Sequence, residues 1–321
     1  MPRPRLALTL GDPNGIGPEV VLKTLADDAV RERVEPVIVG SEAVLRRHAA
    51  HLGMEEVAQG LTVWEVAARE TPEVAWGQTT PIGGRLAMRA VERAADACME
   101  RAADAMVTAP ISKEAITRAG YRFPGHTEFL AQRTHADGFT MMLVSGGLRV
   151  ALVTTHVPVR AVADLITPGA ILGKLRIVAA SLARDFGIER PTVAVLGLNP
   201  HAGDGGVIGR EEQDVIEPAL EVARAEGLNV AGPFPADSFF GMRGYDRHDA
   251  ILAMYHDQGL APFKALAMGG GVNFTAGLPI IRTSPDHGTG FDIAGEGRAN
   301  AGSFREAVLL AAEMAGRRAG R

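Results

Sequence analysis

The sequence predicts an α/β protein built on a mainly parallel sheet that helices cover. Short runs rich in Val, Ile and Leu alternate with longer segments of helical periodicity, which is typical of this class. At 321 residues, the chain is long enough for two lobes that each bury a core. Hydrophobic residues make up 46% and charged residues 22% of the chain, so we expect all of it to be folded.

The apolar runs and the helical periodicity place the individual elements. We expect strands at residues 6–10, 37–39, 61–66, 105–108, 140–144, 150–154, 192–196 and 250–254. We expect helices at residues 18–25, 84–103, 168–186, 211–226 and 303–315. His48 and His51 are interpreted as ordinary surface residues of a further helix.

Charge and cysteine content exclude several classes of protein. A net charge of -5 with a pI near 6.0 gives no basic face for nucleic acid. The single cysteine, Cys98, allows no intrachain disulfide and is interpreted as a buried small residue in a reducing compartment. The first apolar run is too short for a signal peptide, and no segment has transmembrane length. We therefore expect a cytoplasmic protein with no membrane partner.

Three of the nine histidines follow predicted strands: His156, His201 and His256. Because the carboxyl ends of parallel strands gather at one edge of a sheet, these imidazoles can converge on one divalent metal with open positions for substrate oxygens. The alternative is that each histidine only hydrogen-bonds a loop. The wide spacing matches no local motif, so the sequence leaves both interpretations open.

Other segments have the residues of an anion site. The turn at residues 11–19 follows a strand and opens a helix, so it either receives an anion or is a tight connection. Thr127 is expected to cap a helix beside His126, leaving first-turn N–H groups for a phosphate. Lys264, Asn273 and Arg282 form a set suited to carboxylate plus phosphate, although each is also a plausible surface or turn residue.

Six motifs together give this sequence a family resemblance over nearly its whole length. It resembles the 4-hydroxythreonine-4-phosphate dehydrogenases of pyridoxal phosphate biosynthesis through the segments at residues 11–19, 125–128, 155–158, 199–203, 255–259 and 286–289. Each motif alone is weak, but their common order makes a chance match very improbable. The residues 287–300 also resemble the adenosine loop of isocitrate and isopropylmalate dehydrogenases, which bind their cofactor without a Gly-x-Gly-x-x-Gly turn.

The resemblance implies a set of site residues. It implies a divalent metal on His156, His201 and His256, zinc first, with magnesium, manganese or cobalt as other candidates. It implies a homodimer with the active site at the interface, in which one metal ligand comes from the partner. Substrate contacts are implied for His126, Thr127, Lys264, Asn273 and Arg282. NAD or NADP is expected on the adenosine loop, at His287, Gly288, Thr289, Asp292, Ile293 and Asn300.

The resemblance also implies a three-layer α/β/α fold like that of isocitrate and isopropylmalate dehydrogenases, with two lobes and a cleft between them. We expect a discontinuous cofactor-side lobe, residues 1–135 plus 280–321, and a central lobe, residues 136–279, with the metal ligands and the dimer interface. The scarcity of linkers fits this discontinuous arrangement.

The implied reaction is a metal-assisted, NAD(P)-dependent oxidation of 4-phosphohydroxy-L-threonine, with decarboxylation to 3-amino-2-oxopropyl phosphate. Asp257 or Lys264 is expected to be the general base, and the sequence does not choose between them. The motifs do not separate this substrate from sugar acids such as erythronate or threonate 4-phosphate. A phosphate acyltransferase of the same broad fold and a non-catalytic metal- or phosphate-binding protein are the alternatives from other classes.

Overall fold

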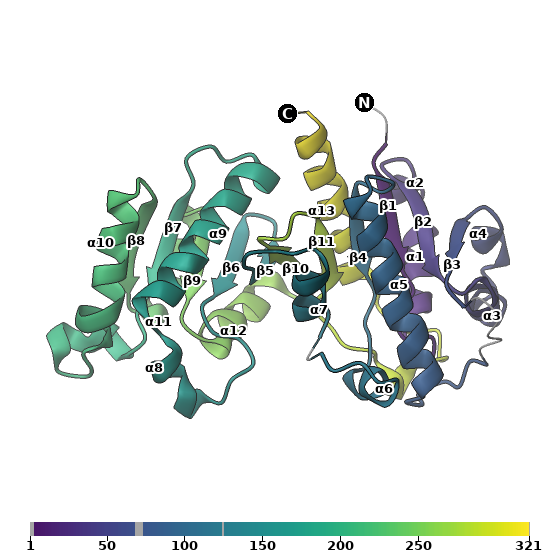
Figure 1. Cartoon of the computed structure of the whole chain (residues 1–321), viewed down its shortest axis with the longest axis horizontal. Helices are drawn as coiled ribbons and strands as arrows, with labels where there is room; N and C mark the ends of the chain where they lie inside the picture. The colour runs from purple at the N-terminus through teal and green to yellow at the C-terminus, as the bar shows by residue number, and fades with distance from the viewer. Residues whose placement is uncertain (1–2, 68–72, 124, 321) are drawn as a thin grey trace. The chain divides into compact units, whose positions relative to one another are not determined.

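The computed structural model describes residues 3–67, 73–123 and 125–320 (Figure 1). The chain forms two compact units, of which the first combines Met1–Ala136 with Leu278–Arg321 and the second is Asp137–Gly277. Both units have a β-sheet with helices packed on it, so the α/β class predicted from the sequence is confirmed.

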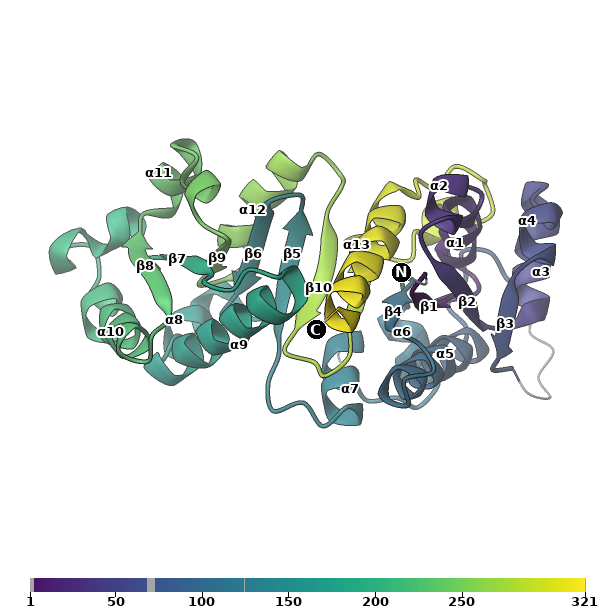
Figure 2. The same ribbon diagram turned by 90° about the horizontal axis from the view of Figure 1, so that it is seen from above.

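The first unit contains a parallel sheet in the order β3-β2-β1-β4-β11. Helices α1 and α13 lie on one face of this sheet and α5 lies on the other (Figure 2). Its strands are β1 (Arg5–Thr9), β2 (Glu35–Gly40), β3 (Thr62–Glu65), β4 (Ala105–Thr108) and β11 (Arg282–Pro285). Its helices are α1 (Gly17–Leu25), α2 (Asp28–Arg31), α3 (Glu42–Leu52), α4 (Glu55–Gln59), α5 (Pro81–Met99), α6 (Lys113–Arg118), α7 (His126–Arg133), η5 (Phe291–Ile293) and α13 (Gly302–Ala319).

Local sequence explains where the central elements of this unit begin. Strands β1 and β4 are almost continuous apolar runs because both of their faces are covered by helices. Helix α5 begins after Thr80, whose hydroxyl accepts a hydrogen bond from the N–H of Gly83, and Pro81 occupies its first position. Ser112 caps α6 in the same way through the N–H of Ala115.

The second unit contains a mixed sheet in the order β10-β5-β6-β9-β7-β8. Strands β6, β9, β7 and β8 are parallel to one another, and β5 is antiparallel to both β6 and β10. Helices α9 and α10 pack on one face and α12 on the other (Figure 2). Its strands are β5 (Thr140–Ser145), β6 (Leu148–Leu152), β7 (Thr192–Leu196), β8 (Asn229–Phe234), β9 (Ala250–Ala253) and β10 (Val272–Ala276). Its helices are η1 (Val159–Ala161), α8 (Val162–Leu165), α9 (Pro168–Phe186), η2 (Pro200–Gly206), η3 (Glu212–Ile216), α10 (Glu217–Ala225), α11 (Ala236–Gly241), η4 (Gly244–Arg247) and α12 (His256–Ala267).

The expected strands and helices all have counterparts, but the structure also has elements that were not predicted. These are strands β8, β10 and β11, the longer helix α12, and the short helices α2, α4, α6, α8 and α11. Helix α12 contains Gly259 and Pro262, residues that weaken a helical pattern in the sequence. Packing stabilises the helix nevertheless, because Leu260 and Phe263 are buried in the core cluster with β6 and β9. Tertiary burial therefore outweighs low local propensity at this helix.

Two further predictions concern Cys98 and membrane segments. Cys98 is buried on α5, and burial raises the pKa of its thiol to about 12, so it stays protonated. In the described part of the chain, no single helix has the length and apolarity needed to cross a bilayer. Two successive helical segments, Val159–Leu165 and Pro168–Phe186, reach that length and apolarity only when they are counted together, and the chain bends by 88° between them.

Gly84 gives a test of the packing between α5 and α6. A Cβ at this position would lie 2.2 Å from the carbonyl oxygen of Ala115, a backbone atom that cannot move aside cheaply. We expect Gly84→Ala to lower the free energy of unfolding by about 2 kcal/mol. Gly316→Ala on α13 is the matched control, since nothing lies within 4 Å of its added methyl group. Its better helix propensity should raise stability by up to about 1 kcal/mol. Urea denaturation measures both, and equal effects would contradict this packing.

Candidate active site

Two of the three expected metal ligands lie side by side in the second unit. His156 follows β6 and His256 follows its parallel neighbour β9, and their ring centroids are 5.8 Å apart. They line a pocket of about 240 Å³. The pocket is formed by Thr155, His156, Val157, Val159, Val162, Tyr255, His256 and Asp257. The strand-end argument therefore brings two of the three rings to one pocket, and their binding of a metal stays a prediction.

Asp257 orients the ring of His256. Its Oδ1 lies 2.7 Å from Nδ1 of His256, a contact in which Nδ1–H donates to the carboxylate. The lone pair of Nε2 then faces away from this contact, which is the arrangement that a metal-ligating histidine needs. Asp257 itself is largely exposed.

His201 lies apart from this pair. The rings of His156 and His256 contact each other, but within the described ranges no three His, Cys, Asp or Glu side chains are grouped so that they could hold a metal ion. Strand β7 ends at Leu196, and the chain then continues into the turn η2 before it reaches His201. This longer connection leaves His201 exposed on its own turn.

The turn that carries His201 has an unusual backbone. Residues 201–205 all have positive φ, between 44° and 80°, including the non-glycine residues His201, Ala202 and Asp204. Left-handed conformation costs about 1–2 kcal/mol for each such residue, so the surrounding structure must hold the turn in place. The position of His201 is thus imposed by tertiary contacts.

Glu212 supplies those contacts from the first turn of the π-helix η3. The side chain is buried, and its Oε1 accepts hydrogen bonds from the N–H groups of Leu198 and Asn199, both at 2.7 Å. Its Oε2 accepts from the side-chain amide of Asn199 at 2.9 Å. A π-turn is rare and frequently occurs at functional sites. Glu212 therefore fixes the segment that leads into the His201 turn.

Arg282 provides a buried positive charge among the expected substrate residues of the first unit. Arg282 on β11 is 3% exposed, and its Nε and Nη2 donate to the hydroxyl of Thr108 at 3.1 and 2.8 Å. Burial lowers the pKa of Arg282 to about 10, and the nearby Glu128 opposes this shift, so the guanidinium remains charged at neutral pH. A buried cation of this kind suits a phosphate or a carboxylate.

His126 adds a neutral donor or acceptor near this charge. Burial, and then the positive charge of Arg282, hold the pKa of His126 well below its usual value. Its Nε2 is buried with no hydrogen-bond partner among the described residues. An uncharged imidazole with an unsatisfied nitrogen is therefore available to a ligand.

The prediction that Thr127 caps α7 is wrong. Helix α7 begins at His126, and its N-cap is Gly125, which makes no side-chain cap hydrogen bond. Thr127 lies inside the first turn, so its hydroxyl is not used as a cap. The expected contact of Thr127 with the substrate is a separate prediction, and it stays a prediction.

The second unit contains the other two expected substrate residues. Asn273 lies on β10, and its Oδ1 is buried without a hydrogen-bond partner in the part of the chain described here. Lys264 is exposed on α12. The structure thus gives Asn273, like His126, an unsatisfied polar atom.

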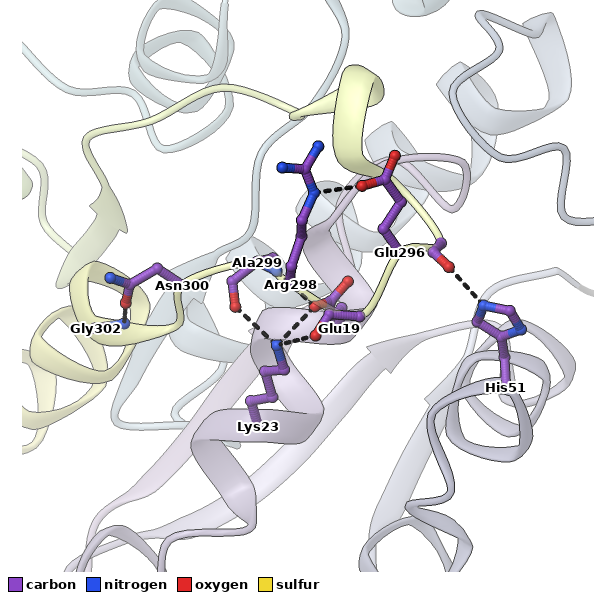
Figure 3. Close-up of polar contacts among 10 residues, drawn as sticks. Glu19, Lys23, His51, Glu296, Arg298, Ala299, Asn300 and Gly302 are labelled. Carbon is purple, nitrogen blue, oxygen red and sulfur yellow. Dashed lines mark hydrogen bonds and ion pairs between the residues drawn. The ribbon is translucent and has the colours of Figure 1, made fainter.

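The loop at residues 287–300, the expected adenosine loop, is fastened to the rest of the first unit (Figure 3). Glu19 and Lys23 on α1 bond the backbone of residues 297–299, and His51 Nε2 lies 2.6 Å from the carbonyl oxygen of Gly295. His287 Nε2 is buried and makes no hydrogen bond to any residue described. The loop is therefore attached to α1 and α3 by several hydrogen bonds, and it has one buried nitrogen, Nε2 of His287, without a partner among the described residues.

The turn at residues 11–19 is a tight connection that supports this loop. The N–H of Ile16 donates to the carbonyl oxygen of Thr289 at 2.9 Å, and a Cβ at Gly15 would lie 2.6 Å from the same atom. The N–H groups of Asp12, Asn14 and Gly15 donate to protein oxygens. These donors are not free for an anion, so the connection is the better interpretation of the two that the sequence left open.

The prediction of an ordinary surface residue is wrong for His48, whereas His51 is exposed on α3 as expected. His48 is 2% exposed, and its Nε2 bonds the carbonyl oxygen of Pro13 at 2.9 Å. Burial lowers the pKa of His48 to about 4, so it is neutral at physiological pH. The ring of Trp76 contacts both histidines, at centroid distances of 4.4 and 4.9 Å. The signal in the sequence was their spacing of three residues, which places both side chains on one face of a helix, where a single neighbour can contact both.

Comparisons with known proteins decide the family. The family described as pyridoxal phosphate biosynthetic protein PdxA matches residues 32–311. A protein from Chromobacterium violaceum named 4-hydroxythreonine-4-phosphate dehydrogenase is 48% identical, over 98% of each chain. This chain belongs to the PdxA family.

Solved structures agree with this assignment. A 4-hydroxythreonine-4-phosphate dehydrogenase from Klebsiella pneumoniae is 38% identical and superposes with a TM-score of 0.87 over 98% of each chain. A terephthalate 1,2-cis-dihydrodiol dehydrogenase from Burkholderia xenovorans is 29% identical, with a TM-score of 0.68 over 97% of this chain and 98% of that one. The resemblance inferred from the six motifs is confirmed, since the PdxA relatives cover the whole of the segment that carries them.

Asp12 is a buried carboxyl in the turn at residues 11–19. Its Oδ1 accepts from the N–H of Asn14 at 3.0 Å, whereas Oδ2 has no hydrogen-bond partner among the described residues. Burial raises the pKa of Asp12 to about 6, and the Asn14 N–H only partly offsets this. The side chain therefore carries a proton more readily in the folded chain than in the unfolded one.

Asp12→Asn tests this pKa shift. The folded pKa of about 6 exceeds the unfolded value of 3.8, so wild-type stability is lost as the pH rises through this window. Asparagine has no charge to desolvate. The stability advantage of the variant over wild type should grow by about 2 kcal/mol between pH 4 and pH 8. Urea denaturation across this pH range measures the difference, and an advantage independent of pH would contradict the shift.

Proposed function

We propose that this chain is an NAD(P)-dependent 4-hydroxythreonine-4-phosphate dehydrogenase of pyridoxine 5′-phosphate biosynthesis. It oxidises 4-phosphohydroxy-L-threonine, which loses carbon dioxide to give 3-amino-2-oxopropyl phosphate. One observation supports the site beyond family membership. Buried polar atoms normally have partners, yet three residues expected to bind ligands keep unpartnered ones within the described chain: His126, Asn273 and His287.

We assign the substrate to His126, Thr127, Lys264, Asn273 and Arg282. Arg282 provides a buried positive charge and His126 a neutral imidazole, which together suit a phosphate or carboxylate. Thr127, Lys264 and Asn273 add a hydroxyl, an ammonium and an amide. The reaction needs a group that accepts the proton of the substrate hydroxyl, and Asp257 and Lys264 are the two candidates.

The metal and dinucleotide fit the residues available to them. His156 and His256 lie together, and Asp257 orients the ring of His256 for ligation. Imidazole nitrogens are common ligands of zinc, so we propose zinc first, with magnesium, manganese or cobalt as other candidates. When bound, the metal would lower the pKa of the substrate hydroxyl and NAD or NADP would accept the hydride. We assign the dinucleotide to His287, Gly288, Thr289, Asp292, Ile293 and Asn300.

We propose that His201 completes the metal site from the partner subunit of a homodimer. It is exposed and separate from the pair formed by His156 and His256. In the described chain, the exposed large apolar side chains lie in the second unit, apart from Met99. Val207 and Ile208, just after the His201 turn, are among them. The two adjacent exposed side chains beside the His201 turn support an interface at that place.

Alternatives from other classes are weaker. Family membership leaves no reason to prefer a phosphate acyltransferase or a non-catalytic binding protein. A sugar acid such as erythronate 4-phosphate remains the second candidate substrate, because none of the residues above distinguishes an amino group from a hydroxyl. We place the enzyme in the cytoplasm, where a single free cysteine stays reduced.

A reduction assay tests the reaction. Purified protein should reduce NAD or NADP with 4-phosphohydroxy-L-threonine, lose this activity with a chelator and regain it with added zinc, because the metal activates the hydroxyl. Erythronate 4-phosphate is the comparison substrate. Activity with the sugar acid alone would transfer the assignment to the second candidate, and activity with neither acid would refute the dehydrogenase.

Complementation tests the shared metal site. His156→Ala and His201→Ala should each be inactive alone. When they are co-expressed, the purified population should regain roughly a quarter of wild-type activity, since about half of the dimers are mixed and each mixed dimer of twofold symmetry has one of its two sites intact. The matched control is His156→Ala with His256→Ala, which should not complement. Rescue by the control pair and not by the test pair would place His256, instead of His201, across the interface.

A further inference from the structure

Lys23 makes a complete set of hydrogen bonds to the loop at residues 287–300. Its Nζ lies 2.8 Å from Oε1 of Glu19, and 2.9 Å from the carbonyl oxygens of both Gly297 and Ala299 (Figure 3). An ammonium has three protons to donate, and here three acceptors receive them. The side chain therefore joins α1 to two backbone carbonyls that are far away in the sequence.

Glu19 completes the same contact from one turn earlier on α1. It is 2% exposed, and its Oε1 accepts from Lys23 and from the N–H of Ala299 at 2.8 Å. A buried carboxylate without its cation would be strongly destabilising, so the two side chains depend on each other. Together they hold the N–H and C=O groups of Ala299 and the C=O of Gly297.

The contact fixes the end of the loop where Asn300 lies. Asn300 Oδ1 accepts from the N–H of Gly302 at 2.8 Å, at the start of α13. The loop backbone is thus held on one side by α1 and on the other by α13. Ordering a free loop costs about 1–2 kcal/mol for each residue, and a loop ordered beforehand avoids that cost when a ligand binds.

We propose that Lys23 and Glu19 are positioning residues for the nicotinamide dinucleotide. They hold the loop in its binding shape before the dinucleotide arrives, and neither takes part in the chemical step. This inference rests on the proposed function, because that function assigns the dinucleotide to the loop. It predicts that the two residues affect dinucleotide affinity and leave catalysis at saturating dinucleotide unchanged.

Trp76 gives a direct readout of this loop. A Cβ at Gly295 would lie 2.9 Å from the indole of Trp76, so the ring packs on the loop backbone. The sequence has two tryptophans, and the other, Trp64, contacts Arg93. In a Trp64→Phe background, energy transfer from Trp76 to bound NADH or NADPH reports binding without any need for turnover.

The test is Lys23→Met in that background. The dissociation constant for NADH or NADPH should rise about tenfold, which corresponds to about 1.4 kcal/mol. The KM for NAD(P) should rise equally, with the KM for the phosphorylated acid and the kcat unchanged. The control is Arg46→Ala, which breaks another i,i+4 ion pair of the same unit, Arg46 with Glu42, at the surface. This control should bind the dinucleotide like its parent.

Glu19→Gln is a second variant, which keeps an acceptor for the Ala299 N–H but removes the charge opposite Lys23. It should weaken dinucleotide binding in the same direction, and it decides the question if Lys23→Met does not fold. Unchanged dissociation constants, or equal losses for dinucleotide and phosphorylated acid, would overturn the inference while leaving the dehydrogenase intact. If the Trp64→Phe parent binds no dinucleotide, the loop assignment and this inference both fall.

Discussion

Buried polar atoms need hydrogen-bond partners, and this requirement determines both the rigid and the open parts of this protein. Where the chain supplies every partner, as Glu19 and Lys23 do for the loop at residues 287–300, the backbone is held in one shape. Glu212 has the same effect on the segment before His201. Where partners are lacking among the described residues, at His126 and Asn273, our proposal is that a polar ligand supplies them.

Segments held by many hydrogen bonds and polar atoms without partners both belong to a binding site. The site must leave polar atoms for the ligand while the backbone that carries them keeps one conformation. A left-handed turn such as that of His201 is costly, and a buried carboxylate keeps it in place. The chain uses lysine for this purpose as well. It has few lysines, and Lys23 and Lys174 both donate to backbone carbonyls, Lys174 to that of Phe139. A compact ammonium suits such a position better than the broad fork of an arginine.

Charge state follows from the same burial. Desolvation keeps His126 and His48 neutral, whereas Arg282 stays charged because its pKa falls only to about 10. The proposed anion site therefore combines one permanent charge with one neutral ring, which allows it to bind a phosphate without changing its own protonation near neutral pH. Asp12 is a carboxyl whose pKa burial raises to about 6, so it keeps its proton to a higher pH than a free carboxyl does.

The sequence alone determined the α/β class, the expected strands and helices and, through six short motifs, the PdxA family, because apolar periodicity and motif order are local properties of the chain. It also placed His156 and His256 at neighbouring strand ends. Tertiary structure decided that His201 stands apart, that Thr127 is no cap, and that His48 is buried. It also decided that Lys23 and Glu19 hold a loop some 280 residues away. Those features depend on which distant backbone groups a side chain meets, and local pattern has no information about such partners.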